Sequence, residues 1–512
     1  MNYIIGIDIG TTSTKAVLYN EKGRVIESTH VGYPLYQETE DMAEQDVEEV
    51  FEAVIHTLKH IIRQSKIEVS KISGVSFSAA MHSLILVDEK VKPLTRLITW
   101  ADNRAAKYSE RLKENKQGKK LYEKTGTPIH PMTPLSKLIW LRNEEAEIFK
   151  QASYFIGIKE YIFYRLFGEL KIDQSIASAT GLYNIFTHTW EPEALKLAGI
   201  TVDQLSEIVS TSYQFCDLNQ SYADMIGLPK ETIFIIGASD GVLSNLGVNA
   251  MEKDVLAVTI GTSAAVRTVI KEPIIDPKER LFCYVLDEEY YVLGGPVNNG
   301  GIILEWIRDQ LFTSEKETAK QLGIDSYDLL TQIAERIPAG SDGLLFLPYL
   351  GGERAPIWDA NARGTYFGLN HHHTRAHMLR SVLEGIIFNL YLVLIALEEV
   401  IPSVKSIQAT GGFARSELWC QMLADIFEKK VNIPKSFESS CLGAAILGLR
   451  SLKIIDDLKE VEKMIGVTHD YLPQKDTFNA YQSLLPIFMR LTHQLQEEYR
   501  EIAEYQRNSH NE

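Results

Sequence analysis

Short apolar runs alternate with amphipathic segments over the first eighty residues of the chain. Residues 3–10, 13–20 and 23–31 are apolar runs separated by turn residues, which predicts three strands joined by tight turns. Residues 44–65 place valine, isoleucine, leucine and phenylalanine at helical spacing, and residues 72–80 form another apolar run. Strands followed by a helix and a further strand indicate an α/β domain.

The second half of the chain begins in the same way. Residues 254–270 have the pattern of a strand, a Gly-Thr-Ser turn and a second strand, and Gly261 follows Gly10 by about half the chain length. Two similar halves that share a cleft would explain this echo. The alternative is that Gly-Thr is merely common in hairpins. We expect two domains, residues 1–247 and 248–512.

Two later segments predict long helices. Residues 377–401 are strongly apolar, and residues 481–506 are amphipathic, with a polar, frayed end expected at 508–512. The sequence contains no run of eighteen consecutive apolar residues, so we expect no membrane partner.

Composition narrows the classes of protein to consider. Of the 512 residues, 45% are hydrophobic and 23% are charged, as in a soluble globular protein. The net charge of −16 disfavours nucleic-acid binding, although a local cationic pocket for a small anion is compatible with it. The four scattered cysteines and the start, which has the pattern of a core strand rather than a signal peptide, predict a cytoplasmic location.

The turn after the first strand carries the first candidate chemistry. A tight turn directs successive N–H groups at one spot, glycine lets a phosphate approach, and threonine hydroxyls add donors. Asp8, just before this turn, could hold a magnesium ion or its waters. The sequence has no P-loop pattern. The hairpin residues assigned to phosphate binding are Gly10, Thr11, Thr12, Lys15, Gly261, Thr262 and Ser263.

Asp240 is the second candidate, because it follows an apolar strand and lies among glycine-rich turns. An aspartate before a helix is often only an N-cap. Alternatively, it is the general base that phosphoryl transfer to a sugar hydroxyl needs, a role worth about 10²–10⁴-fold in rate. Both explanations can hold, since a helix N-terminus fixes the side chain.

These segments resemble the FGGY carbohydrate kinases over nearly the whole chain. The segments that carry the resemblance, in order, are GIDIGTTSTKAVL, MTPLSKLIWL, TIGTSAAV, GGERAPIWD, YFGLNHHHTRAHMLRSVLEG and ATGGFARSELWCQMLADIF. The resemblance implies an α/β fold of two actin-like (ribonuclease H-like) ATPase domains with a cleft between them, with ATP and Mg²⁺ as cofactors. It also implies that Asp240 is the catalytic base and that Asp8 holds the metal. The nucleotide residues that it adds are Gly300, Gly301, Gly411, Gly412 and Ala414.

Further sequence segments bear on which sugar accepts the phosphate. The segments FSAAMHSLILVD, TWADNR, GIKEYIF and SDGVLSNLGVNA are most similar to family members that phosphorylate D-gluconate on its 6-hydroxyl. The substrate-binding residues this implies are Met81, His82, Asp102, Arg104, Lys159 and Asp240. Neutral-sugar kinases share the Met-His and Trp-x-Asp-x-Arg patterns, so xylulose or another pentulose is the alternative acceptor.

Other functions compete with this interpretation. An actin-like ATPase without a small-molecule acceptor is the non-kinase alternative. Segment 79–137, which contains Trp100, His82, His130 and Asn103 on the proposed sugar side, argues against it. The family resemblance allows a homodimer, although no segment locates an interface. His371–His373 predicts an exposed loop rather than a metal site, and Arg354 a structural residue paired with Glu353 or Asp359.

Overall fold

The computed structural model describes residues 2–39, 41–434, 438–466 and 469–509, and it divides into two compact units. Unit 1 contains Met1–Met251, Val269–Leu293 and Glu438–Gly466, and unit 2 contains Glu252–Thr268, Gly294–Phe437 and Val467–Glu512. The chain therefore passes between the units several times. The single boundary between residues 247 and 248 stays a prediction about domains, which need not coincide with units defined by compactness.

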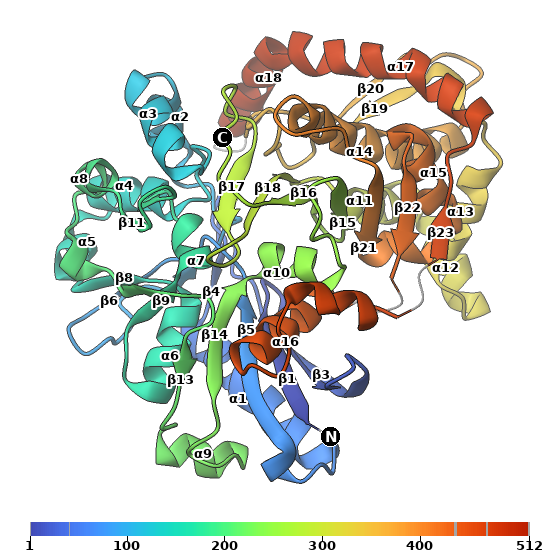
Figure 1. Ribbon diagram of the computed structural model, residues 1–512. Helices are drawn as coiled ribbons and strands as arrows, with labels where there is room; N and C mark the ends of the chain where they lie inside the picture. Colours follow the sequence, from blue (N-terminus) through green and yellow to red (C-terminus); the bar gives the residue numbers. More distant parts are fainter. Residues whose placement is uncertain (1, 40, 435–437, 467–468, 510–512) are drawn as a thin grey trace. The chain divides into compact units, whose positions relative to one another are not determined.

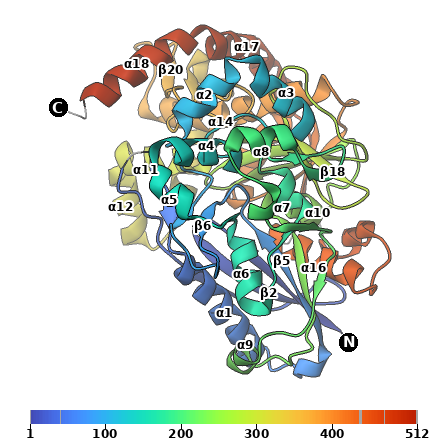
Figure 2. The same ribbon diagram turned by 90° about the vertical axis from the view of Figure 1, so that its left-hand side faces the viewer.

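Unit 1 is built on one mixed sheet whose order is β3-β2-β1-β5-β14-β13 (Figures 1 and 2). Strands β1, β2 and β3 form an antiparallel meander, β1, β5 and β14 run parallel, and β13 is antiparallel to β14. The strands of this unit are β1 (Tyr3–Ile9), β2 (Ser13–Asn20), β3 (Val25–Gly32), β4 (Glu44–Gln45), β5 (Ile72–Ala79), β6 (Ile85–Val87), β7 (Leu97–Ile98), β8 (Tyr154–Ile156), β9 (Lys171–Asp173), β10 (Tyr183–Asn184), β11 (Thr189–Trp190), β12 (Glu207–Val209), β13 (Gln214–Phe215), β14 (Phe234–Ser239) and β17 (Phe282–Val285).

Helices cover both faces of this sheet, which is why β1 is apolar almost throughout. Ile5 and Ile7 pack with Phe51 of α1 on one face, whereas Ile4 packs with residues of α10 and α16 on the other. Gly6 has to be glycine, because a Cβ there would lie 2.1 Å from the carbonyl oxygen of Cys441. The helices are α1 (Val47–Gln64), α2 (Ala106–Lys113), α3 (Lys116–Thr125), α4 (Pro134–Glu144), α5 (Ala146–Gln151), α6 (Ile158–Phe167), α7 (Gln174–Ser178), α8 (Pro192–Ala198), α9 (Gln220–Ile226), α10 (Asp240–Gly247) and α16 (Ser439–Ser451).

Six neighbouring strands of the second sheet, β18-β16-β15-β21-β22-β23, repeat this plan, and β17 lies next to β18 at the edge of that sheet. Strands β15 and β16 form an antiparallel hairpin, β15, β21 and β22 run parallel, and β23 is antiparallel to β22. The predicted similarity between the two halves of the chain, each with a Gly-Thr turn, is therefore confirmed by the strand topology. The strands are β15 (Val255–Ile260), β16 (Ala264–Ile270), β18 (Tyr291–Val297), β19 (Leu345–Leu347), β20 (Thr365–Phe367), β21 (Ser406–Thr410), β22 (Lys430–Ile433) and β23 (His469–Tyr471).

The helices of unit 2 include the long apolar helix that the sequence predicts over residues 377–401. They are α11 (Gly301–Gln310), α12 (Thr313–Leu322), α13 (Ser326–Glu335), α14 (Arg375–Glu398), α15 (Glu417–Phe427), α17 (Lys475–Gln494) and α18 (Gln496–Ser509). Helix α14 is long and apolar enough to cross a membrane, but 83% of its most apolar window is buried inside the protein, as in a core helix. The single terminal helix predicted over 481–506 is wrong: the helix is interrupted at Leu495, whose ψ is 5°. Of the frayed end predicted at 508–512, residues 510–512 lie outside the described residues.

Candidate active site

The turn between β1 and β2 is held by side chains from three other segments of unit 1. The Tyr33 hydroxyl donates to the carbonyl of Gly10 at 2.6 Å, and the Gln45 amide donates to the carbonyl of Thr11 at 2.6 Å. The indole N–H of Trp100 donates to the Thr11 hydroxyl at 2.8 Å. These bonds fix the position of the turn, and within it the N–H of Gly10 donates to the carbonyl of Ser13 at 3.0 Å. The main-chain N–H of Tyr33 also donates to the carbonyl of Thr12.

Asp8 lies at the end of β1 in an environment that disfavours its charge. Burial first, and then repulsion from Asp240, raise the pKa of Asp8 to about 7, although the Ser78 hydroxyl donates to it at 2.7 Å and Lys15 opposes the shift. The structure thus brings Asp8, Asp240 and Lys15 into one electrostatic cluster. A cation beside Asp8 would restore its carboxylate form.

Lys15 shares its charge with a carboxylate from late in the chain. Its ammonium lies 3.0 Å from Glu438, and both side chains are 40% exposed. An ion pair this exposed contributes little to stability, so Lys15 can leave it at small cost. A phosphate contact from Lys15 stays a prediction.

Asp240 is the first residue of α10, directly after β14. Its Oδ1 accepts from the main-chain N–H of Gly241 at 2.7 Å, so the carboxylate is fixed at the helix N-terminus. The strand before it is braced, because Ser175 accepts from the N–H of Ser239 at 3.2 Å and Lys159 donates to the carbonyl of Ala238 at 3.1 Å. The N-cap explanation of Asp240 is wrong, because Ser239 is the N-cap of α10 and Asp240 occupies the first helical position.

Lys159 lies beneath this strand end, where its ammonium is 2.6 Å from Asp173. The two side chains are 3% and 0% exposed. Burial lowers the pKa of Lys159, and the Asp173 carboxylate opposes that shift. A direct contact between Lys159 and the sugar stays a prediction. In the structure the Lys159 ammonium already binds the Asp173 carboxylate and the carbonyl of Ala238.

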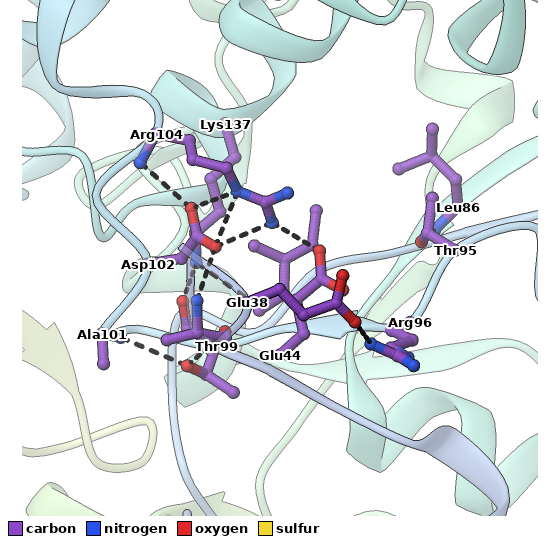
Figure 3. A network of polar contacts seen from close by, with 12 residues as sticks. Glu38, Glu44, Leu86, Thr95, Arg96, Thr99, Ala101, Asp102, Arg104 and Lys137 are labelled. Atoms are coloured by element: carbon purple, nitrogen blue, oxygen red, sulfur yellow. Dashed lines mark hydrogen bonds and ion pairs between the residues drawn. The ribbon is translucent and has the colours of Figure 1, made fainter. Parts of the chain in front are cut away.

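Asp102 and Arg104 form a compact charged network with Glu44 (Figure 3). The fully buried Asp102 carboxylate accepts from the N–H of Ala43 at 3.0 Å, and the Arg104 guanidinium lies 2.7 Å from Asp102 and 2.5 Å from Glu44. The guanidinium also lies 4.5 Å from the centre of the Trp140 ring. Two carboxylates therefore already balance the Arg104 charge.

Met81 and His82 follow the end of β5. Met81 lines a small cavity together with Thr11, Gln45 and Trp100, so the structure places it beside the first hairpin turn. His82 is buried with a positive φ of 67°, and its Nδ1 lies 2.8 Å from the carbonyl oxygen of Ala179. This backbone conformation is sparsely populated for a residue with a side chain, and such residues often occur at functional sites.

In unit 2 the second hairpin packs directly on the start of α11. The N–H of Gly301 donates to the carbonyl of Gly261 at 2.6 Å, and that of Ile302 donates to the carbonyl of Thr262 at 3.1 Å. A Cβ on Gly300 would lie 2.7 Å from the carbonyl of Ser263. These glycines permit the close packing, and they set the hairpin beside a helix N-terminus, a common place for a phosphate.

The segment after β21 approaches the same strand end. Gly411 has a φ of 112°, and a Cβ on it would lie 2.3 Å from the carbonyl oxygen of Ile260, the last residue of β15. Gly412 has open space around its Cα, and the N–H of Ala414 donates to the carbonyl of Gly411 at 3.1 Å. The predicted nucleotide residues of unit 2 thus gather around the end of β15.

Several supporting contacts were not identified from the sequence. Gln45 and Trp100 brace the first turn, as described, and the buried Glu353 accepts from the N–H of Asn298 at 2.6 Å and from the Asn299 amide at 3.0 Å, just before Gly300. The GGERAPIWD motif draws attention to Glu353 in the sequence, but it does not indicate which groups Glu353 contacts. Its neighbour Arg354 donates to the carbonyl of Val297 at 3.0 Å.

Among the residues that the structure describes, no group of three or more histidine, cysteine, aspartate or glutamate side chains is placed so that it could hold a metal ion. His371–His373 form an exposed turn in which the N–H of Asn370 donates to His373 at 3.0 Å.

Comparison with known proteins identifies the family. Family models of the FGGY family of carbohydrate kinases match residues 3–247, as its N-terminal domain, and 256–452, as its C-terminal domain. The chain belongs to this family. It is 54% identical over 507 residues to a gluconokinase from Bacillus subtilis, covering 99% of this chain and 98% of that protein.

Two solved structures from Lactobacillus acidophilus are similar in fold. A gluconate kinase has a TM-score of 0.91 and a ligand-bound xylulose kinase a TM-score of 0.92, each with 41% sequence identity. Both comparisons cover 98% of this chain, and 99% and 100% of the other chains. The predicted family and two-domain α/β fold are therefore confirmed, and the protein is a carbohydrate kinase that uses ATP.

Replacing Gly411 by alanine tests the packing at the end of β15. We expect the free energy of unfolding to fall by about 1–3 kcal/mol and the KM for ATP to rise, because the new Cβ meets main-chain atoms at a positive φ. Urea denaturation and steady-state kinetics measure the two effects. Gly412→Ala is the matched control for stability, since a Cβ at that position would meet nothing within 4 Å. Equal losses of stability in the two variants would contradict the close packing of Gly411.

Proposed function

We propose that this kinase transfers the γ-phosphate of ATP to the 6-hydroxyl of D-gluconate, giving 6-phospho-D-gluconate. The observation that carries the proposal is the 54% identity, over almost the full length of both chains, to a protein named gluconokinase. The proposed location is the cytoplasm, where ATP is available, and a homodimer remains an untested expectation.

Asp240 is the general base of the proposed reaction. It accepts the proton of the 6-hydroxyl while that oxygen bonds to the γ-phosphorus and the bond to the β–γ bridging oxygen breaks, releasing ADP. The position of Asp240 at the start of α10, with Lys159 and Ser175 bracing the strand before it, supports this role. Donors of the first hairpin turn, among them the Thr11 and Thr12 hydroxyls, stabilise the charge on the transferring group.

Asp8 is the proposed residue for the magnesium ion that accompanies ATP. Magnesium commonly keeps several waters and takes only one or two carboxylates together with substrate phosphates. A buried carboxylate whose pKa is raised to about 7 by burial and by the nearby Asp240 fits such a site, since a cation would stabilise its ionised form. When bound, the ion neutralises charge on the phosphates.

Recognition of the gluconate carboxylate needs hydrogen-bond donors more than an unpaired cation. Arg104 is balanced by Asp102 and Glu44, and Lys159 is balanced by Asp173. We therefore propose that the Met81–His82 segment, Trp100 and the Arg104 network shape the sugar site. To contact the sugar directly, Asp102 would have to exchange its ion pair with Arg104, and Lys159 its ion pair with Asp173, for the sugar.

A pentulose is the alternative acceptor, because a protein named xylulose kinase is as similar to this chain, at 41% identity, as the gluconate kinase from the same organism. A coupled ADP-release assay with D-gluconate, D-xylulose, L-ribulose and glycerol separates the two. We expect saturable turnover with gluconate and a kcat/KM at least about tenfold lower with each neutral sugar. Turnover confined to a ketose would reverse the assignment, and ATP hydrolysis indifferent to any acceptor would favour the non-kinase ATPase.

A further inference from the structure

Lys137 on α4 is a fully buried lysine that the proposed reaction does not use. Its side chain is 0% exposed, and its ammonium donates to the main-chain carbonyls of His82 at 2.6 Å and Thr99 at 2.7 Å, with that of Ile98 at 3.5 Å. Within the described residues its hydrogen-bond partners are all carbonyls, and none is a carboxylate. Figure 3 shows Lys137 beside the Asp102–Arg104 network.

The carbonyls that Lys137 holds belong to two segments proposed to bind the sugar. His82 follows Met81, and Thr99 lies three residues before Asp102. These segments already meet at one bridge, where Leu84 and Ile98 exchange main-chain hydrogen bonds of 3.0 and 2.9 Å. Lys137 adds a second connection at the ends nearest the proposed sugar residues.

The backbone at this connection needs support. His82 has a positive φ of 67°, a strained conformation for a residue with a side chain, which persists only where the surrounding structure holds it. The hydrogen bond from Lys137 is made to the carbonyl of this same residue. The short hydrogen bonds from the Lys137 nitrogen to the carbonyls of His82 and Thr99 can hold this strained peptide in place.

Packing alone does not explain a lysine at this position, because burying its charged group costs free energy. Burial lowers the pKa of Lys137 to about 7, with Asp102 opposing the shift and Arg104 adding to it. The neighbouring positions Leu138 and Ile139 on the same helix are filled by apolar side chains. The buried ammonium is best explained by what its three donors connect.

We propose that Lys137 is a positioning residue of the sugar site, joining the Met81–His82 segment to the segment of Thr99–Arg104 so that both present their side chains in one arrangement. This inference rests on the proposed function only in taking these segments as sugar-binding. Lys137 itself contacts no substrate, and it acts through the main chain of His82 and Thr99.

The test replaces Lys137 by methionine, which keeps the length of the side chain and removes its donors. We expect the KM for the sugar to rise by about 30-fold, with kcat and the KM for ATP changed less than about threefold. The sugar-induced rise in melting temperature should disappear, whereas the rise induced by ADP should persist. A role in stability alone would not separate the two substrates in this way.

Arg142→Met is the matched control on the same helix. Arg142 also donates to a main-chain carbonyl, that of Leu197 at 2.9 Å, but it connects α4 to α8 rather than to the sugar segments. We expect this control to leave the KM for the sugar unchanged. An equal rise in both variants, or no rise in Lys137→Met, would overturn the proposal.

Two further arrangements keep the test decisive. If Lys137→Met does not fold, Lys137→Gln, which has fewer donors on a shorter side chain, is measured instead. A rise in the sugar KM with the KM for ATP unchanged supports the connection, and an unchanged sugar KM, or an equal rise in both KM values, overturns it. The variants are assayed with whichever sugar the unmodified enzyme phosphorylates. A failure of gluconate as acceptor is therefore detected in the unmodified enzyme and leaves the role of Lys137 to be decided separately.

Discussion

The Asp240→Asn variant is expected to lose about 10³-fold in kcat while it remains folded and binds ATP. Asparagine cannot accept the proton of the attacking hydroxyl, and a positioned general base contributes about 10²–10⁴-fold to such reactions. The variant keeps an oxygen that can accept from the N–H of Gly241, so the start of α10 should remain intact. Steady-state kinetics with saturating sugar and ATP give kcat, and calorimetric titration gives the affinity for ATP.

A comparison with Asp8→Asn separates a base from a metal ligand. Loss of Asp8 should raise the Mg²⁺ concentration needed for half-maximal rate, whereas loss of Asp240 should lower kcat at every Mg²⁺ concentration. Removing either carboxylate also removes repulsion from the other, because Asp240 contributes to the raised pKa of Asp8. An Asp240→Asn enzyme with kcat within about fivefold of the unmodified protein would exclude Asp240 as the base.

The strands and turns near the site could be predicted because their signals are local. The three strands predicted over residues 3–31 correspond to β1, β2 and β3, and the helix predicted over 44–65 corresponds to α1. The two Gly-Thr turns join antiparallel hairpins, β1–β2 and β15–β16, that occupy equivalent positions in the two sheets. Apolar periodicity and turn chemistry are properties of neighbouring residues, so one sequence is enough to read them.

The partners of the polar residues near the site could not be predicted in the same way. Trp100 reaches Thr11, which is far from it in sequence, and Glu438 pairs with Lys15 from near the other end of the chain. Such contacts depend on how distant elements pack, and no periodicity encodes them. The sequence marked Arg104 and Lys159 as positive charges near the sugar, but it contained no sign that carboxylates already balance them.

This difference matters for how the acidic substrate is discriminated. A cation that is paired in the folded protein offers an incoming carboxylate only what remains after its first partner is displaced. Discrimination between gluconate and a neutral ketose should then depend on the shape and donors of the site, which small rearrangements of its two segments would alter. To change the discrimination between gluconate and a ketose, variants should therefore alter the positions of those two segments rather than the number of nearby cations.

Replacing Lys159 by methionine is expected to be the most destabilising change near the site. It leaves the fully buried Asp173 carboxylate without its ammonium partner, and breaking a buried pair by removing one member costs about 3–5 kcal/mol. It also removes the bond to the carbonyl of Ala238, two residues before Asp240. Urea denaturation monitored by circular dichroism measures the loss, and little folded protein at about 37 °C would be consistent with it.

The double variant Lys159→Met/Asp173→Asn should recover at least half of that stability, because no buried charge is left unpaired. Asparagine at position 173 can still accept from the N–H of Ile176 and cap α7. With the fold restored, the KM for the sugar separates the two roles of Lys159. We expect it to change less than about threefold, since the ammonium is buried against Asp173; a rise of about tenfold or more would mean that Lys159 leaves Asp173 and binds the sugar directly.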